Sequence, residues 1–377
     1  MWKWLVLVFF QLSVFDCAVK NNNNRSLHVP NFANRNLGDA SSTCKAKYWT
    51  LVKYFDGFPK NTDMTIREEN LPPLKNGEFL AKAVFLSVDP YQRVLGSFPD
   101  QVKLGEPFLG QQIAQIVETK NTRYPIGKYV RAPFGWRTLT ISNGQIPDED
   151  KPLDVLPDYG KLPVSLGLGV LGMTGMTAYF GLLEVCKPKA GETIVISGAA
   201  GAVGNLVGQI AKIKGLTVIG IAGSDEKGKW LKQELGFDQF INYKKDNIDE
   251  KLKQVAPKGV DCYFDNVGGE ISSSVLYQMN DFGRVAVCGS ISAYNTPVKP
   301  KVTIVQPAIL FKQLKVEGFD NGRWTDRFPE AVKQYLQWIR EGKIKYEETV
   351  TVGFENTFKA FLGMLKGENR GKAVVKL

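Results

Sequence analysis

A short β-branched run that leads into a glycine-rich turn constrains the fold of this chain more than any other feature. Thr193–Ser197 has the composition of a fully buried parallel strand. The turn after it has the pattern G-x-x-G-x-x-G, with Ala200 in the place of the middle glycine of the common dinucleotide-binding fingerprint. Apolar residues then recur at helical spacing, at Leu206, Val207, Ile210 and Ile213. The sequence therefore predicts a strand, a tight turn and a helix in succession.

Such a junction is suited to binding an anion. Backbone N–H groups and the helix dipole favour negative charge there, and small side chains let a pyrophosphate come close. A glycine turn alone is weak evidence, because many α/β proteins use one only for packing. Here a second strand pattern, residues 216–224, follows at the spacing of a β-α-β unit. This context favours dinucleotide binding.

The end of the second strand indicates which dinucleotide is bound. An NAD site usually has an acid there, about 20 residues on, whereas an NADP site has room and positive charge. Gly223 stands where the acid would be, and Ser224 and Lys227 can hydrogen-bond to or pair with a phosphate. Asp225 and Glu226 complicate this interpretation, and the same residues also suit the start of a helix. We favour NADPH over NADH.

Length and charge narrow the class of protein. A chain of 377 residues is long enough for two domains and a large core. Residues 1–50 supply +4 of the net charge of +10, and the other +6 is spread thinly, without the clustered Lys and Arg with interleaved aromatics of a nucleic-acid-binding surface. Beyond the N-terminus, no stretch is long and apolar enough to span a membrane. We therefore expect a small-molecule substrate, no nucleic acid and no stable membrane partner.

Histidine and cysteine usage excludes several chemistries. His28, in a polar N-terminal segment, is the only histidine, so a Ser-His-Asp or Cys-His catalytic machine is excluded. The five cysteines are scattered, without a C-x-x-C pair, so no zinc or other metal site is expected. Reduced, mostly buried thiols are the simpler interpretation and suit a reducing compartment. The cysteines are Cys17, Cys44, Cys186, Cys262 and Cys288.

The N-terminal sequence argues against a reducing compartment. Residues 1–44 read as a leader, in which residues 1–18 resemble a secretory signal peptide. Asp16 makes the cleavage site after Ala18 poor, and Asn24 lies in a glycosylation sequon within an asparagine-rich patch. Three interpretations remain open: a true signal, a signal anchor, and upstream sequence added to a cytosolic enzyme. We expect the folded part to begin near Lys45.

Two patterns divide the rest of the chain. Residues 45–168 hold strand patterns bounded by Gly, Pro or Asn, which predicts an antiparallel, barrel-like domain. Residues 169–337 alternate strand and helix patterns, which predicts a doubly wound parallel sheet. Residues 338–377 form a strand-like tail after a helix predicted over 328–344. The fold class is α/β with a second, β-rich domain.

Several strings are long enough to be specific for a family. From about Lys45 to Leu377 the chain resembles the zinc-independent medium-chain dehydrogenase/reductases, and among them the branch that reduces prostaglandins and alkenals. This resemblance implies a GroES-like catalytic domain, interrupted by a Rossmann NADP-binding domain, with the tail returning to the first domain. It also implies a cytoplasmic homodimer. The strings are "VDPYQR" (88–93), "GMTGMTAYFGLLE" (172–184), "GAAGAVG" (198–204), "GSDEK" (223–227), "DCYFDNVGGE" (261–270), "CGSISAYN" (288–295) and "LKGENRGK" (365–372).

The resemblance assigns a cofactor role to each matching position. The pyrophosphate would lie on Gly201, Ala202, Val203 and Gly204. Lys227 and Tyr243 would bind the 2′-phosphate, with Ser224 beside them, and Asn266 would line the cleft. The nicotinamide ribose would run along Cys288, Gly289, Ser290, Ile291, Ser292, Ala293 and Tyr294. Phe319, Asp320 and Asn321 would lie near the nicotinamide, and Asn369 would reach the cofactor from the tail.

The activity implied is NADPH-dependent reduction of the C=C bond of α,β-unsaturated ketones and aldehydes. Charge builds on the carbonyl oxygen as an enolate, so a donor aimed at that oxygen lowers the barrier by about 3–4 kcal/mol. Tyr294, after the carboxyl end of a sheet strand, is the first candidate donor, and Tyr91 is the second. Arg93 is a candidate for a substrate carboxylate, against a structural salt bridge as the simpler interpretation.

One departure and three alternatives stay open. Asp320 and Asn321 stand where relatives carry apolar residues, which changes the polarity expected of the substrate pocket. A quinone reductase of the same superfamily would share the fold and cofactor. A non-catalytic NADPH-binding protein would bind the cofactor without turnover. A secreted binding protein would require cleavage near residue 18 and a sugar on Asn24.

Overall fold

The computed structural model describes residues 44–146, 151–296, 298 and 300–377. The interpretations of the leader, including the signal peptide over 1–18 and the sequon at Asn24, lie outside these residues. The first described strand begins at Cys44, one residue before the predicted start of the fold. Among the described residues, no helix is both long and apolar enough to cross a membrane.

The first half of the chain forms antiparallel strands. β1 and β2 pair with each other, and a seven-stranded sheet has the order β14-β15-β3-β4-β5-β7, with β6 on β3. Aromatic side chains fill the core beneath it, among them Phe55, Phe108, Trp136 and Phe361. The elements are β1 (Cys44–Leu51), β2 (Met64–Leu71), β3 (Phe79–Ser87), α1 (Tyr91–Leu95), β4 (Gln112–Thr119), β5 (Tyr129–Ala132), β6 (Leu139–Ser142), β7 (Asp154–Val155) and the 3₁₀ helix η1 (Val164–Leu168).

The middle of the chain forms a six-stranded parallel sheet with the order β10-β9-β8-β11-β12-β13. The strand order reverses between β8 and β11, which creates the crevice where ligands of doubly wound sheets bind. The predicted doubly wound parallel sheet is therefore confirmed. The elements are α2 (Met173–Phe180), the π-helix η2 (Gly181–Cys186), β8 (Thr193–Ser197), α3 (Gly204–Ile213), β9 (Thr217–Ala222), α4 (Asp225–Gln233), β10 (Gln239–Asn242), α5 (Ile248–Val255), β11 (Val260–Asp265), α6 (Gly269–Leu276), β12 (Met279–Val287), α7 (Ile291–Tyr294), α8 (Gln306–Phe311), β13 (Lys315–Gly318), the 3₁₀ helix η3 (Asn321–Arg327) and α9 (Phe328–Arg340).

Alternation along the central strand explains why helices cover both faces of this sheet. Ile194 and Ile196 of β8 pack with side chains of α2, α3, α4 and α9. Val195, between them, points to the opposite face and packs with side chains of α5, α6 and α8. A strand buried on both faces is apolar throughout, which is why Thr193–Ser197 showed no polar alternation in the sequence.

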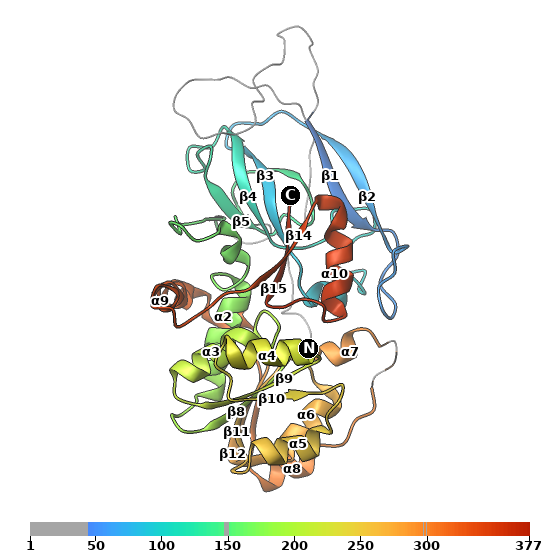
Figure 1. Ribbon diagram of the computed structural model, residues 1–377. Coiled ribbons are helices and arrows are strands. Elements are labelled where there is room, and N and C mark those ends of the chain that lie inside the picture. Colours follow the sequence, from blue (N-terminus) through green and yellow to red (C-terminus); the bar gives the residue numbers. More distant parts are fainter. Residues whose placement is uncertain (1–43, 147–150, 297, 299) are drawn as a thin grey trace.

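The end of the chain returns to the first half. Figure 1 shows β14, β15 and α10 among the strands from the start of the chain, and β15 pairs antiparallel with β3. The predicted domain boundary at residue 337 falls inside α9, which ends at Arg340 instead of residue 344, so the crossing back lies after this helix. The remaining elements are β14 (Glu348–Val352), η4 (Phe354–Asn356), α10 (Thr357–Leu365) and β15 (Lys372–Lys376).

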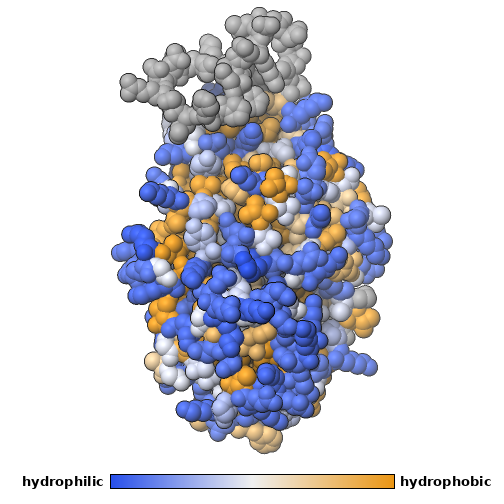
Figure 2. Space-filling view, in the orientation of Figure 1, coloured by the Kyte–Doolittle hydropathy of each residue, from blue (hydrophilic) through white to orange (hydrophobic). Residues whose placement is uncertain are grey.

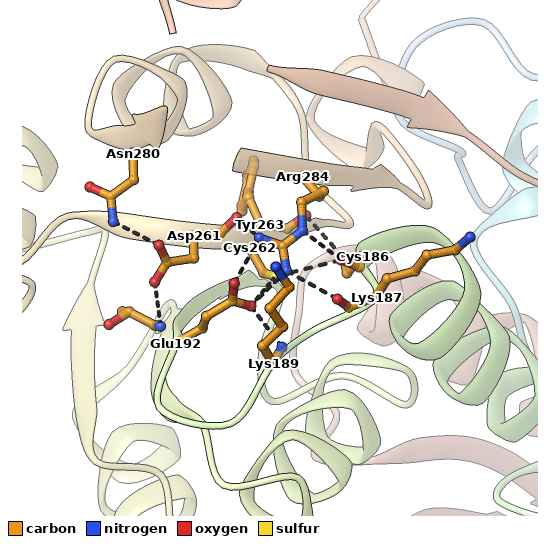
Figure 3. Close-up of polar contacts among 10 residues, drawn as sticks. Cys186, Lys187, Lys189, Glu192, Asp261, Cys262, Tyr263, Asn280 and Arg284 are labelled. Atoms are coloured by element: carbon orange, nitrogen blue, oxygen red, sulfur yellow. Dashed lines mark hydrogen bonds and ion pairs between the residues drawn. The ribbon is translucent and has the colours of Figure 1, made fainter. Parts of the chain in front are cut away.

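An arginine network holds the amino-terminal edge of the parallel sheet (Figure 3). Arg284 of β12 donates to both oxygens of Glu192, at 3.0 and 2.6 Å, and to the carbonyls of Cys186 and Lys187. These bonds join β12, the start of β8 and the end of the π-helix. Cys186 and Cys262 lie beside the network as buried, free thiols. The network is at the opposite edge from the crevice, so it supports the fold and not the chemistry.

Candidate active site

The glycine turn has the close backbone contacts that require its residue types. A Cβ atom on Gly204 would lie 2.5 Å from the Gly198 carbonyl oxygen, and Gly198 itself has a φ of +60°. The N–H of Gly201 donates to Gly198, and the N–H of Asn205 donates to Gly201. The amides of Ala202, Val203 and Gly204 lie between these two bonds, at the N-terminus of α3. This geometry fits a pyrophosphate, which needs bare backbone N–H groups at a helix start.

The C-terminal tail lies directly on this turn. The N–H of Gly371 donates to the carbonyl of Ala200 at 2.9 Å, and Gly371 forms an isolated bridge with Gly201. Asn369 donates its side-chain N–H to the Gly371 carbonyl at 2.8 Å. Asn369 therefore shapes the tail where the tail meets the turn. Sequence reasoning gave no role to Gly371, because its partner lies 171 residues earlier in the chain.

The residues predicted for the 2′-phosphate lie together. An added Cβ on Gly223 would lie 3.0 Å from the Tyr243 hydroxyl, so a larger side chain at this position would have to displace Tyr243. Lys227 donates from Nζ to the carbonyl of Gly367 at 2.6 Å. Burial and the neighbouring Lys244 lower the pKa of the Lys227 ammonium. Figure 2 shows hydrophilic side chains gathered over α4 on this face of the molecule.

Ser224 caps a helix, and its place beside the 2′-phosphate stays a prediction. Its Oγ accepts from the N–H of Lys227 at 3.3 Å, so it is the N-cap of α4. Asp225 pairs with Lys245 at 2.5 Å and accepts from Asn242 at 2.6 Å, which directs its charge to the β10 side. The capping interpretation and the phosphate interpretation of the "SDEK" string are thus compatible.

A buried carboxylate organises the loop at the carboxyl end of β11. Asp265 Oδ1 accepts from the hydroxyls of Ser197 and Tyr263 at 3.0 and 2.9 Å, and from the N–H groups of Val267 and Gly268 at 3.0 and 2.9 Å. Ser272 donates to Oδ2. Sequence reasoning missed Asp265, although an acid that ends a buried strand just before Asn-Val-Gly-Gly was the available signal.

The predicted cofactor segment 288–294 packs on this loop. The carbonyl of Asp265 accepts from the N–H groups of Cys288 and Gly289, at 2.8 and 3.1 Å. Ser292 donates its hydroxyl to the Val267 carbonyl at 2.6 Å, while Asn266 donates its side-chain N–H to the Ser197 carbonyl at 2.7 Å. Asn266 thus crosses from β11 to the start of the glycine turn. Both predicted groups therefore border the same crevice, at the carboxyl ends of β8 and β11.

Cys288 is not a reactive thiol in this position. Burial, with the nearby Asp265 and Asp320 carboxylates, raises the pKa of the Cys288 thiol to about 12. A thiol with this pKa stays protonated at neutral pH and is a poor nucleophile. The absence of a role for Cys288 in catalysis agrees with its assignment to cofactor contact alone.

Tyr294 ends α7 with its hydroxyl held by the backbone. The N–H of Ser290 donates to the Tyr294 oxygen at 3.1 Å, which leaves the O–H hydrogen available to a second partner. Burial is the main cause that raises the pKa of Tyr294, with smaller contributions from Cys288 and Asp265. The phenol is therefore neutral over the physiological range and able to donate.

Arg93 occupies a different role from the one considered for a substrate carboxylate. Its Nε donates to Asn295 Oδ1 at 2.9 Å, and its other nitrogens donate to Ser97 Oγ and the Gly57 carbonyl, both at 2.5 Å. It is only 4% exposed. The partners are neutral groups, so the salt bridge that we considered is also not what forms. Arg93 instead ties α1 to the residue that follows Tyr294.

Tyr91 is the first residue of α1. Arg93, on the same helix, bonds to Asn295 at the end of α7. Burial and the charge of Asp89 raise the pKa of the Tyr91 phenol. Two neutral tyrosines, one from each domain, are therefore carried by helices that a single arginine joins. Figure 1 shows α7 at the level where the two halves of the molecule meet.

The side chains of residues 319–321 are engaged in contacts with neighbouring residues of the chain. Phe319 packs edge-on against Phe264 with ring centroids 6.0 Å apart. Asp320 caps η3 through the Gly322 N–H, and Asn321 donates to Thr177 Oγ1 at 2.8 Å and to the Met173 carbonyl at 3.1 Å. The polar departures at 320 and 321 are thus explained by local hydrogen bonds to η3 and α2.

Two cavities border this region, and neither is in the crevice itself. One of about 10 Å³ lies behind the glycine turn, beside Ala202 and Asn205, and holds no more than about one water. The other, of about 360 Å³, lies between α6 and the edge of the parallel sheet. Its wall is mainly apolar, with Val285, Val287 and Val316 on its sheet side.

Comparison with known proteins identifies the family. Residues 47–148 match a family model described as the N-terminal domain of oxidoreductase, and residues 202–340 match one described as zinc-binding dehydrogenase. Prostaglandin reductase 1 of Bos taurus is 51% identical over 335 residues, which are 88% of this chain and 99% of the relative. The chain belongs to the prostaglandin reductase family. This places it among the medium-chain dehydrogenase/reductases and confirms both the family and the GroES-like plus Rossmann fold class that the sequence predicted.

Two further relatives agree with the cofactor. A 2-alkenal reductase (NADP(+)-dependent) of Nicotiana tabacum is 37% identical over 339 residues, 86% of this chain and 95% of the relative. The solved structure of CurA in complex with NADPH from Vibrio vulnificus superposes with a TM-score of 0.81 at 36% identity, covering 88% of this chain and 98% of that one. The protein is thus an NADP-dependent oxidoreductase, as predicted.

The part of the chain that the structure describes offers no zinc site. Over residues 44–146, 151–296, 298 and 300–377, no group of three or more His, Cys, Asp or Glu side chains is arranged to hold a metal ion. The described cysteines are Cys44, Cys186, Cys262 and Cys288, and all four are free. No step of the chemistry is therefore assigned to a metal.

Proposed function

We propose that this protein reduces the C=C bond of α,β-unsaturated ketones and aldehydes, with oxo-prostaglandins and 2-alkenals as substrates. The proposal is supported by the names of its relatives and by one observation in particular. A neutral Tyr294, with its oxygen held by the Ser290 N–H, ends the segment 288–294 that borders the cofactor crevice. Bound NADPH supplies a hydride for the β-carbon of the enone.

In the proposed mechanism Tyr294 stabilises the enolate. As charge develops on the carbonyl oxygen of the substrate, the Tyr294 O–H donates to that oxygen. The Ser290 N–H continues to donate to the phenol oxygen, and this polarises the O–H bond and strengthens its donation. Tyr294 itself keeps its proton, so no dedicated acid is required and the α-carbon takes its proton from solvent.

Several residues prepare the crevice for the cofactor in this proposal. The turn Gly201–Gly204 presents the backbone N–H groups of Ala202, Val203 and Gly204 to the pyrophosphate, and Lys227 with Tyr243 takes the 2′-phosphate. Asp265 fixes the loop on which Cys288 and Gly289 rest. Tyr91 supplies a second neutral hydroxyl from the other domain, and Arg93 is a positioning residue instead of a substrate anchor.

The pH profile tests the protonation state of Tyr294. Only the neutral phenol donates to the enolate, and its pKa is raised above the ordinary value near 10. We expect kcat to stay level up to about pH 10 and to fall only at higher pH. The measurement is kcat at saturating NADPH from pH 6 to the limit of stability. A fall centred near pH 7 to 8 would contradict the assignment.

The cofactor preference tests Lys227. Replacing Lys227 by alanine removes a charged donor from the 2′-phosphate, which we expect to raise KM for NADPH by about 10- to 100-fold. KM for NADH should change by less than about two-fold, because NADH has no 2′-phosphate. Lys229→Ala, an exposed position on the same helix, is the matched control. Equal effects on both cofactors would contradict the role of Lys227.

The activity itself is tested by NADPH oxidation with the full chain. The substrates are 15-oxo-prostaglandin E2, a medium-chain 2-alkenal and, separately, a quinone, with NADH as the control cofactor. Turnover of the enones that prefers NADPH supports the proposal. Turnover of the quinone alone favours a quinone reductase, and NADPH binding without turnover favours a non-catalytic protein.

We also propose that the protein is a homodimer that pairs through β13. This strand is the edge of the parallel sheet, and Val316 on it is exposed, as are Ile304 and Phe311 near it. Antiparallel pairing of two copies about Val316 would place Lys315 of one subunit opposite Glu317 of the other, which is favourable. Pairing would also satisfy the backbone groups that an unpaired edge strand exposes.

The Val316→Lys variant tests this interface. It places two like charges at the two-fold axis, so we expect a monomer by size-exclusion chromatography with light scattering. Val350→Lys is the matched control, because Val350 is exposed on β14, the edge strand of the other sheet. A wild-type monomer, or a Val316→Lys dimer, would contradict the proposed interface.

A further inference from the structure

Two amide side chains connect the glycine turn with the returning chain. Gln209 and Asn205 lie one helical turn apart on α3, and each is only 3% exposed. Neither residue is among those assigned to the cofactor in the proposed function. Buried amides form hydrogen bonds or cost stability, so the identity of their partners decides what they do.

Gln209 is bonded to the chain that enters β14. Its Oε1 accepts from the Lys345 N–H at 2.7 Å, and its Nε2 donates to the Lys345 carbonyl at 2.9 Å. This pair of bonds fixes both the position and the orientation of the amide. Lys345 precedes β14, a strand of the seven-stranded sheet of the first domain. Gln209 therefore fixes the position of α3 relative to the first domain.

Gln209 is bonded in turn to Asn205. Its Nε2 also lies 3.3 Å from Asn205 Oδ1, which accepts. With its oxygen directed to Gln209, Asn205 presents its NH₂ group to the turn. Asn205 Nδ2 donates to the Gly201 carbonyl at 2.6 Å and to the Ala202 carbonyl at 3.2 Å. The relay thus runs from Lys345 through two amides to two carbonyls of the turn.

The positions of these two carbonyls also determine the direction of the backbone N–H groups that follow them. In a planar trans peptide the C=O and the following N–H point in opposite directions. Because Asn205 draws the carbonyls of Gly201 and Ala202 toward itself, the N–H groups of Ala202 and Val203 point away from it. These N–H groups are among those assigned to the pyrophosphate.

We propose that Gln209 and Asn205 are positioning residues for the pyrophosphate. They couple the conformation of the glycine turn to the position of the returning chain at Lys345. The inference rests on the proposed function, because it takes the turn as the pyrophosphate site. It adds that cofactor affinity depends on a contact with the first domain that lies behind the turn and does not touch the cofactor.

The test compares two ligands on the full chain. NADPH spans the turn, whereas adenosine 2′-monophosphate carries the 2′-phosphate and no pyrophosphate. For Gln209→Leu and Asn205→Ala we expect the Kd of NADPH to rise by about 10-fold or more and that of adenosine 2′-monophosphate by less than about two-fold. At saturating NADPH, kcat should stay within about two-fold of wild type, because the reacting groups are untouched. Gln337→Leu, at an exposed position on α9, is the matched control.

A merely structural role would not produce this difference between ligands. Equal loss of affinity for both ligands, or no loss for either in a folded variant, would overturn the inference. If Gln209→Leu does not fold, Asn205→Ala alone decides, since it removes the donor to the turn and leaves both bonds between Gln209 and Lys345 in place. A wild-type chain that binds neither ligand would overturn the proposed function and the inference together, whereas normal wild-type binding with unchanged variants overturns the inference alone.

Discussion

Replacement of Tyr294 by phenylalanine is expected to lower kcat on an enone by about 100- to 1000-fold, the loss measured when one donor to a developing oxyanion is removed. The ring of phenylalanine keeps the packing of α7, and the variant loses only the O–H. KM for NADPH should stay within about two-fold, because the ribose and phosphate contacts assigned to other residues remain. The measurement is steady-state NADPH oxidation with 15-oxo-prostaglandin E2.

Two control variants test whether the loss is specific to the hydroxyl of Tyr294. Tyr346→Phe makes the same chemical change at an exposed position and should retain wild-type kcat. Tyr91→Phe should have a smaller effect than Tyr294→Phe, because Tyr91 has no backbone donor comparable with the Ser290 N–H to polarise it in the part of the chain that is described. A Tyr294→Phe variant with nearly full kcat, or a larger loss in Tyr91→Phe, would move the oxyanion role away from Tyr294.

The nucleotide site could be predicted from the sequence because its signals are local. The strand, the turn and the helix over residues 193–213 are consecutive, and each of Gly198 and Gly204 meets a steric need that lies within seven residues. Gly223 likewise indicated the cofactor, because it stands at the end of a strand where an NAD site carries an acid. Short-range backbone geometry is what single residues report best.

The contacts that join the domains could not be predicted in the same way. Arg93 was considered for a substrate carboxylate or a salt bridge, and its partner Asn295 lies 202 residues away. Asp320 and Asn321 were interpreted as pocket residues, yet Asn321 bonds to α2, 144 residues earlier. Polar side chains of this kind have many possible partners, and only the folded chain selects one. Asp265 is a different case, because most of its partners lie within seven residues and the local signal was overlooked.

Lys372→Met is expected to lower the free energy of unfolding by about 3–5 kcal/mol, the usual cost of leaving one partner of a buried ion pair alone. The side chains of Lys372 and Asp89 are only 4% and 3% exposed, with Nζ 2.9 Å from the carboxylate. Lys372 also donates to the Val88 carbonyl at 2.7 Å. The substitution keeps the length of the side chain and removes its charge. Urea unfolding followed by tryptophan fluorescence measures the loss.

The same substitution elsewhere on β15 separates charge burial from the loss of a lysine. Lys376 is exposed at the end of this strand, so Lys376→Met should leave stability within about 0.5 kcal/mol of wild type. Adding Asp89→Asn to Lys372→Met should restore part of the loss, because the uncompensated carboxylate is then gone. If Lys372→Met and Lys376→Met unfold alike, the pair does not hold the returning strand. Because Lys372 directly follows Gly371, which bonds to the glycine turn, a confirmed loss would tie the stability of the first domain to the segment that shapes the cofactor site.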